Sequence, residues 1–218
     1  MKIPRSLVWM LVLTASAAAL FALEPPNLTP AKQAVVLYAD SGEYLRDLAV
    51  VSGYANDWIT ARAALKRPDE KLALVLDIDE TALTNLEHMK EMDFGYIPHL
   101  WDEWVAHHHA PAIEPVLAVY RQARRLGVAV FFITGRREKD RPGTESNLVA
   151  SGYGGYEQLL LKPDAFKETT QLFKIASREK IQRDGWTIIA NMGDQQSDLD
   201  GGAAERTYKL PNPFYLIK

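Results

Sequence analysis

Cysteine is absent from this 218-residue chain. Its absence excludes disulfide bonds, zinc sites built from thiolates, thiol catalysis and lipid attachment to an N-terminal cysteine. A protein without disulfide bonds must obtain its stability from the packing of its core, even if it is exported.

An excess of positive charge is also absent. The chain has 25 Lys and Arg against 28 Asp and Glu, and its net charge is −3. We therefore expect no nucleic-acid polymer as partner, and nothing supports polybasic association with membranes. Hydrophobic residues make up 47% and charged residues 24% of the chain, which is typical of globular proteins. The length favours one domain with a modest insertion, and a homo-oligomer is compatible with it.

Long apolar runs are scarce outside the N-terminus. There, Lys2 and Arg5 precede an uncharged run from Ser6 to Leu23, and Ala17-Ala18-Ala19 offers a cleavage site of small residues. The run is short for a membrane span, so the pattern favours a cleaved signal peptide at residues 1–19 over an uncleaved anchor. We expect a periplasmic or secreted mature domain at residues 20–218, with no stable membrane association after removal of the signal.

Short apolar runs alternate with segments of helical spacing in the remaining chain. This alternation predicts an α/β fold: a Rossmann-like parallel sheet with helices on both faces and an N-terminal helical extension. Proline at positions 25, 26 and 30 indicates an extended leader before the first helix. The expected strands are Leu72–Leu76, Val128–Ile133, Gln158–Leu161 and Trp186–Ala190, and the expected helices cover about 41–66, 113–127, 142–152 and 168–183.

The segment from about residue 83 to residue 112 has no strand pattern and predicts a small cap. It contains Phe94, Tyr96, Trp101 and Trp104, whose clustering favours a packed cap over a platform for a ligand ring. The run His107-His108-His109 favours an exposed loop over a substrate contact, and a zinc site is the least favoured interpretation, because adjacent histidines cannot all face one ion.

Polar residues follow the expected strands at the ends where ligands bind in open α/β sheets. Asp77 and Asp79 come directly after the first strand, and residues two apart share a face in extended structure. Thr134 follows the second strand, and Asp194 and Asp198 follow the fourth. Because right-handed crossovers bring the carboxyl ends of parallel strands to one edge, these groups are expected to converge. Lys174, on the helix before the fourth strand, joins them.

The chemistry of this set can be judged from its charges. Carboxylates about 4 Å apart repel by about 4 kcal/mol per pair at an effective dielectric constant near 20, so the cluster requires a cation or shifted pKa values. Oxygen ligands without Cys or His favour Mg²⁺ over zinc. A hydroxyl and an ammonium suit an anion with several oxygens, such as phosphate. Together they predict a phosphoryl-transfer site.

Four segments resemble the motifs of the haloacid dehalogenase-like phosphohydrolases: Asp77–Thr81, Phe132–Arg136, Lys174 and Gly193–Leu199. More narrowly, the chain is similar to the acid phosphatases of class B or subfamily IIIB, which include plant vegetative storage proteins and exported bacterial enzymes. Ser41–Tyr44 and the tail Lys209-Leu210-Pro211-Asn212-Pro213 also look like that branch. The resemblance extends from about Lys32 to Tyr215.

The resemblance implies a hydrolase of small phosphomonoester substrates. Asp77 would attack phosphorus and form an aspartyl-phosphate. Asp79 would protonate the leaving oxygen and later take a proton from water. Thr134 and the Gly135 N–H would bind the phosphoryl oxygens.

The resemblance also implies which residues hold the cation and which side chain neutralises the phosphoryl group. Mg²⁺ would be held by the Asp77 carboxylate, the Asp79 backbone carbonyl and Asp194. Asp198 would lie behind these ligands and orient metal-bound water or Lys174. Lys174 would neutralise the phosphoryl group, although Lys162 and Lys167 are rivals for that role. Glu80, in a variable position of the first motif, is expected to be exposed or to cap a helix.

Three other functions remain open from the sequence. One is a storage or phospho-ligand-binding protein of the same fold with little turnover. A second is a phosphotransferase that passes the phosphoryl group to another alcohol. The third, a phosphorylated receiver domain, fits poorly with a signal peptide.

Overall fold

The protein is described by a computed structural model that places residues 25, 27–107 and 110–217. The expected signal peptide at residues 1–19 lies outside the described residues, as do His108 and His109. Within the described part of the chain, no helix has both the length and the apolar character needed to cross a membrane.

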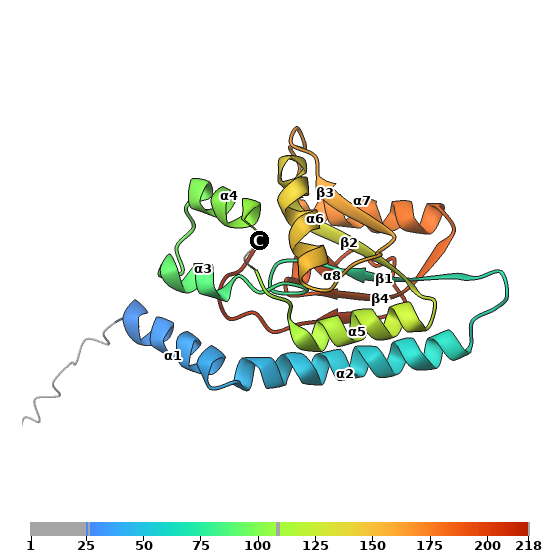
Figure 1. Ribbon diagram of the computed structural model, residues 1–218, viewed down its shortest axis with the longest axis horizontal. Coiled ribbons are helices and arrows are strands. Elements are labelled where there is room, and N and C mark those ends of the chain that lie inside the picture. Colours follow the sequence, from blue (N-terminus) through green and yellow to red (C-terminus); the bar gives the residue numbers. More distant parts are fainter. Residues whose placement is uncertain (1–24, 26, 108–109, 218) are drawn as a thin grey trace, which may run out of the picture.

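A five-stranded sheet forms the centre of the fold, with the strand order β3-β2-β1-β4-β5 and every pairing parallel (Figure 1). The α/β class and the parallel sheet expected from the sequence are confirmed. The short edge strand β5 was not anticipated, because three residues of mixed polarity carry too little pattern. The strands are β1 (Lys71–Leu76), β2 (Ala129–Arg137), β3 (Gln158–Lys162), β4 (Trp186–Gly193) and β5 (Thr207–Lys209).

Helices cover both faces of the sheet, and strand residues alternate between two cores. Leu72, Leu74 and Leu76 belong to the larger core, beneath α2 (Glu43–Ala64) and α5 (Glu114–Arg125), which lie side by side in Figure 1. Ala73 and Val75 face a smaller core beneath α7 (Thr170–Arg183). Burial on both faces explains why β1 reads as a continuous apolar run.

The segment before the first expected helix is itself helical, so the prediction of an extended leader is wrong. Helix α1 spans Leu28–Asp40, and the Asn27 side chain caps it by accepting a hydrogen bond from the Thr29 N–H at 2.9 Å. Pro30 lies in the first turn, where the missing N–H has no helical partner to lose. Proline here marks the beginning of a helix.

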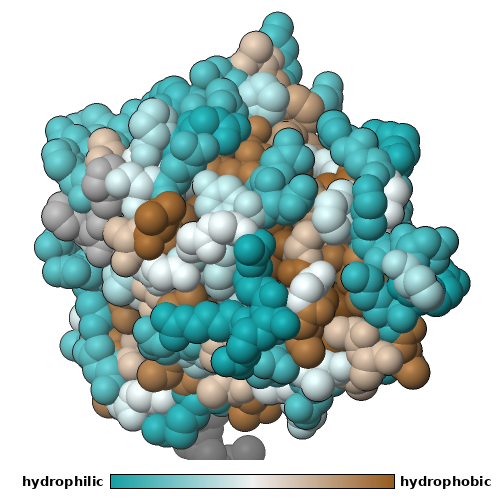
Figure 2. All heavy atoms as spheres, turned by 45° about the vertical axis from the view of Figure 1, so that its right-hand side comes forward, coloured by the Kyte–Doolittle hydropathy of each residue, from teal (hydrophilic) through white to brown (hydrophobic). Residues whose placement is uncertain are grey.

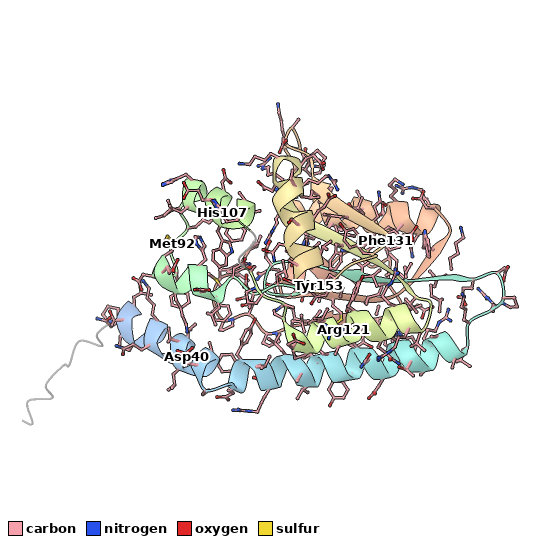
Figure 3. All side chains as sticks on the ribbon, in the orientation of Figure 1. Asp40, Met92, His107, Arg121, Phe131 and Tyr153 are labelled. Carbon is pink, nitrogen blue, oxygen red and sulfur yellow. The ribbon has the colours of Figure 1, made fainter. Side chains whose placement is uncertain are left out.

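Two short helices lie between β1 and α5: α3 (Leu86–Glu91) and α4 (Pro98–Ala106). An ion pair between Lys90 and Asp40 joins α3 to α1. In Figure 3, Asp40 is labelled at the end of α1 and Met92 is labelled next to α3. Helix α4 packs on α6 (Arg141–Ala150), which follows the 3₁₀ turn Glu138–Asp140. His107 is exposed at the end of α4 (Figure 3), in agreement with the expected loop.

The molecular surface is mixed in character. The face shown in Figure 2 carries polar residues over most of its area, with apolar residues in smaller groups between them. This agrees with the balanced composition of the chain.

The contact between α4 and α6 depends on a glycine. A Cβ at Gly143 would lie 2.4 Å from the carbonyl oxygen of Val105, whereas a Cβ at Gly53 in α2 would meet no atom within 4 Å. We predict that Gly143→Ala lowers the free energy of unfolding by about 1–3 kcal/mol, because backbone must move to admit the methyl group. Gly53→Ala serves as the control and is expected to raise the free energy by about 0.5–1 kcal/mol. Urea denaturation measures both, and equal stability of the two variants would show that α4 does not pack on α6 as described.

Candidate active site

The expected site residues gather around one cavity of about 460 Å³ at the carboxyl ends of the strands. Asp77 follows β1 and Asp194 follows β4, while Gly135 belongs to β2. Thr134 lies beside them, fully buried in β2, and its hydroxyl accepts a hydrogen bond from the Arg136 N–H at 3.1 Å. The site residues that line the cavity are Asp77, Asp79, Gly135, Lys174, Asp194 and Asp198.

The ammonium of Lys174 bridges two carboxylates at the buried end of the cavity. Its Nζ donates to Asp77 Oδ1 at 2.5 Å and to Asp198 Oδ1 at 2.6 Å, and all three side chains are buried. Of the two rival lysines, Lys162 instead donates to the Thr170 hydroxyl at 2.9 Å, and Lys167 is exposed. Of these three lysines, Lys174 is the one that contacts Asp77 and Asp198.

Burial and charge act in opposite directions on this cluster. Burial raises the pKa of Asp77 well above its usual range, and the attraction of Lys174 only partly offsets this. For Lys174, burial lowers the pKa, but the charges of Asp77 and Asp198 outweigh it and raise the pKa above its usual value. The lysine therefore stays charged, while an ionised Asp77 needs further positive charge nearby.

Asp194 is held by neutral donors. Its Oδ1 accepts from the Thr81 hydroxyl at 3.3 Å, and its Oδ2 accepts from the side-chain amides of Gln195 at 2.5 Å and Asn212 at 2.6 Å. Burial and the charge of Asp198 raise the pKa of Asp194. These donors fix the orientation of the carboxylate without neutralising it.

Asp198 turns both of its oxygens toward protein donors. Oδ1 accepts from Lys174, and Oδ2 accepts from the Gln195 N–H at 2.9 Å. Its approach to β4 requires glycine at position 193, because a Cβ there would lie 2.4 Å from the Asp198 Cβ. This arrangement agrees with a supporting role for Asp198 behind the reacting groups.

The same cluster is suited to a divalent cation. Asp77, Asp194 and Asp198 are buried, and each offers an oxygen atom within 4.8 Å of the others. Three carboxylates lie close together and one ammonium contacts two of them, so the local charge is negative unless protons or a cation neutralise it. Oxygen ligands of this kind suit Mg²⁺.

The Arg136 guanidinium holds Asp79, a contact that the sequence analysis did not anticipate although Arg136 ends the second motif. Arg136 donates to Asp79 Oδ1 at 2.7 Å, and the Asn85 amide donates to the same oxygen at 2.9 Å. Oδ2 receives only the longer bond from Arg136 Nε, at 3.2 Å, among the described residues. Arg136 also lies over the Trp101 ring, 5.6 Å from its centroid. The side chain of Arg136 therefore contacts both Asp79 and helix α4.

Glu80 is buried, so the expectation of an exposed residue is wrong. Its side chain is 1% exposed and accepts hydrogen bonds from the Asn85 N–H at 2.6 Å and from the Tyr215 hydroxyl at 3.1 Å. Asn85 directly precedes α3, so the bond from its N–H places the Glu80 carboxyl at the beginning of that helix, in line with the other expectation, that Glu80 caps a helix. Burial and the charge of Asp79 raise the pKa of Glu80 to about 8. A carboxyl in a variable motif position gives no sequence signal for burial, because its partners lie outside the motif.

The outer wall of the cavity is largely apolar. Phe94, Tyr96 and Trp101 line it, whereas Trp104 donates its indole N–H to Asn85 Oδ1 at 2.8 Å. The aromatic segment thus contributes both to packing and to the cavity wall. Sequence reasoning missed the tail residues that complete this wall, which are Phe214, Tyr215, Leu216 and Ile217.

Comparison with known proteins agrees with this geometry. Residues 5–218 match the family model described as the HAD superfamily, subfamily IIIB (acid phosphatase). The chain is 36% identical to the stem 28 kDa glycoprotein of Glycine max over 188 residues, covering 83% of this chain and 72% of that protein. It is 31% identical to acid phosphatase 1 of Solanum lycopersicum over 212 residues, covering 90% of this chain and 81% of that protein.

A solved structure shares the fold. The class C acid phosphatase from Bacillus anthracis superposes with a TM-score of 0.71 at 23% identity, covering 85% of this chain and 86% of that one. The resemblance inferred from the four motifs is confirmed by the family match. The chain belongs to the HAD superfamily, subfamily IIIB, the acid phosphatases.

Proposed function

We propose that this protein is an exported, Mg²⁺-dependent acid phosphatase that hydrolyses small phosphate monoesters through an aspartyl-phosphate. The observation that carries the proposal is the buried Lys174 ammonium between Asp77 and Asp198, at the closed end of a cavity open to a small ligand. Such an arrangement neutralises charge at one point and leaves room for a tetrahedral oxyanion beside it.

Asp77 is the nucleophile in this proposal. One carboxylate oxygen forms a bond to phosphorus while the bond from phosphorus to the leaving alcohol oxygen breaks. Lys174 offsets the negative charge of the phosphoryl group as it approaches the carboxylate. Thr134 and the Gly135 N–H bind phosphoryl oxygens at the neighbouring strand end, where the backbone of Gly135 borders the cavity.

Asp79 transfers the protons. Its Oδ2, which has the weaker contact with Arg136, carries the proton that is given to the leaving oxygen. Water then attacks the phosphorus, returns a proton to Asp79, and releases phosphate with an intact Asp77. Arg136 and Asn85 keep Asp79 beside the cavity throughout, because both hold Oδ1.

Asp77 and Asp194, with the Asp79 backbone carbonyl, would hold the Mg²⁺ ion, and Asp198 would support them. The bound ion would supply the positive charge that keeps Asp77 ionised and attracts the phosphoryl oxygens. The fit rests on the buried oxygen donors within 4.8 Å of one another, two of which, on Asp77 and Asp198, share Lys174.

Export and the cap complete the proposal. The basic N-terminal residues and the uncharged run support removal of residues 1–19 and a periplasmic or secreted location. The naming of a Glycine max relative as a glycoprotein is consistent with export. Residues 83–112 act as a small cap, since Phe94, Tyr96 and Trp101 line the cavity that the carboxylates also line.

The storage-protein and phosphotransferase alternatives would use the same site. Turnover of the purified mature protein on a panel of nucleotides, sugar phosphates and aryl phosphates separates an enzyme from a storage protein. Competition by added alcohols, read as phosphorylated alcohol against free phosphate, separates transfer from hydrolysis.

The first prediction concerns the nucleophile. Asp77→Asn should reduce phosphate release by a factor on the order of 10⁴ or more, because an amide cannot form the covalent intermediate. The fold should remain, as judged by circular dichroism, since Lys174 keeps its bond to Asp198. Substantial turnover by a folded Asp77→Asn protein would reject Asp77 as nucleophile.

The second prediction concerns the proton donor. Asp79→Asn should slow release of poor leaving groups by about 10²–10⁴-fold and of good leaving groups much less, because only poor ones need a proton. Asp93→Asn is the control: Asp93 is exposed and has a φ of 49°, which asparagine accepts readily. Equal losses for all leaving groups would count against Asp79 as the acid.

The third prediction concerns the cation. Treatment with a chelator should stop phosphate release, and added Mg²⁺ should restore it, since the carboxylate cluster would otherwise repel the phosphoryl group. The measurement is turnover before chelation, after it, and after Mg²⁺ is returned. Full activity in the presence of chelator would remove the ion from the mechanism.

A further inference from the structure

The C-terminal tail, residues 210–217, returns to the active site after β5. In Figure 1 the dark red segment after β5 runs back toward α3. Phe214 anchors it: its ring packs edge-on against Tyr44 with centroids 5.1 Å apart, and stacks on Phe94 at 6.3 Å. Leu210 begins the tail fully buried and donates its N–H to the Gly193 carbonyl at 2.9 Å. The tail is therefore a packed part of the domain.

Asn212 has its orientation fixed by the tail backbone. Its Oδ1 accepts hydrogen bonds from the N–H groups of Phe214 at 2.8 Å and Tyr215 at 3.4 Å. An amide oxygen that accepts two backbone donors leaves its nitrogen facing the opposite way. That nitrogen donates to Asp194 Oδ2 at 2.6 Å. The side chain thus joins the turn of the tail to a carboxylate of the active site.

Gln195 makes the same kind of link from the other side. Its Oε1 accepts from the Ile217 N–H at 3.0 Å, and its Nε2 donates to Asp194 Oδ2 at 2.5 Å. Two amide nitrogens therefore hold one oxygen of Asp194, and two amide oxygens hold the tail. Asp194 Oδ1 receives the longer 3.3 Å bond from the Thr81 hydroxyl, so it is the oxygen better placed to face a cation.

We propose that Asn212 is a positioning residue that sets the orientation of Asp194, so that the affinity of the site for its divalent cation depends on the folded tail. The proposal rests on the role proposed above for Asp194 as a cation ligand. The partners of a metal-binding carboxylate restrict its rotation, and loss of such a partner typically weakens metal binding by about 10–100-fold.

The test uses Asn212→Ser in the full chain. The serine hydroxyl can still accept from the Phe214 N–H and maintain the turn, but it is too short to reach Asp194. We expect the dissociation constant for Mg²⁺, measured by calorimetry without substrate, to rise about tenfold. Gln196→Ser is the matched control, because Gln196 is exposed and donates to Asp200 at 2.7 Å, away from Asp194.

Three outcomes are distinguishable. Weaker Mg²⁺ binding by Asn212→Ser but not by Gln196→Ser, with the melting temperature of the metal-free protein unchanged, supports the proposal. Unchanged Mg²⁺ binding by a folded Asn212→Ser protein overturns it, as does a lower melting temperature with unchanged binding, which would mean that Asn212 only maintains the turn. If the unmodified protein itself binds no Mg²⁺, the proposed cation role fails first and this inference fails with it.

Discussion

The placement of one buried ammonium between two buried carboxylates is the constraint on which the site depends. Lys174 reaches Asp77 and Asp198 from α7, and none of the three can leave without exposing unpaired charge in the interior. Such a cluster is costly to bury, and hydrophobic packing alone gives no reason for it. A phosphatase site accounts for its presence at the end of β1, because such a site needs a carboxylate positioned beside a positive charge.

The fold brings these charges together because parallel strands end at one edge. β1 and β4 are neighbours, and the residues that follow them, Asp77 and Asp194, therefore meet. Gly193 leaves room for the Asp198 side chain beside β4, because it has no Cβ. The Arg178 guanidinium holds the backbone of Asp198 by donating to its carbonyl at 2.5 Å. Segments outside the motifs then close the cavity: α3, α4 and the C-terminal tail.

Much of this could be predicted from the sequence, because local patterns reported it. The four apolar runs and the helical spacing of the segments between them predicted the sheet and its helices, and the polar residues after the strands predicted the converging motifs. The missed features depend on contacts between distant residues. Buried Glu80 accepts a hydrogen bond from Tyr215, 135 residues later, and Asp79 is held by Arg136, on another strand. Pro30 gave a wrong prediction of extended chain because proline both ends helices and suits their first turn.

The proposed mechanism requires that the Asp77 carboxylate becomes covalently phosphorylated. Its most direct test is to mix the enzyme with an aryl phosphate, quench with acid in the steady state, and map the modification by peptide mass spectrometry. We predict one phosphoryl group on the peptide containing Asp77, labile to hydroxylamine as an acyl phosphate is, and its absence when Asp77 is replaced by asparagine. A phosphoryl group on another residue, or turnover without any labelled peptide under conditions that trap acyl phosphates, would contradict it.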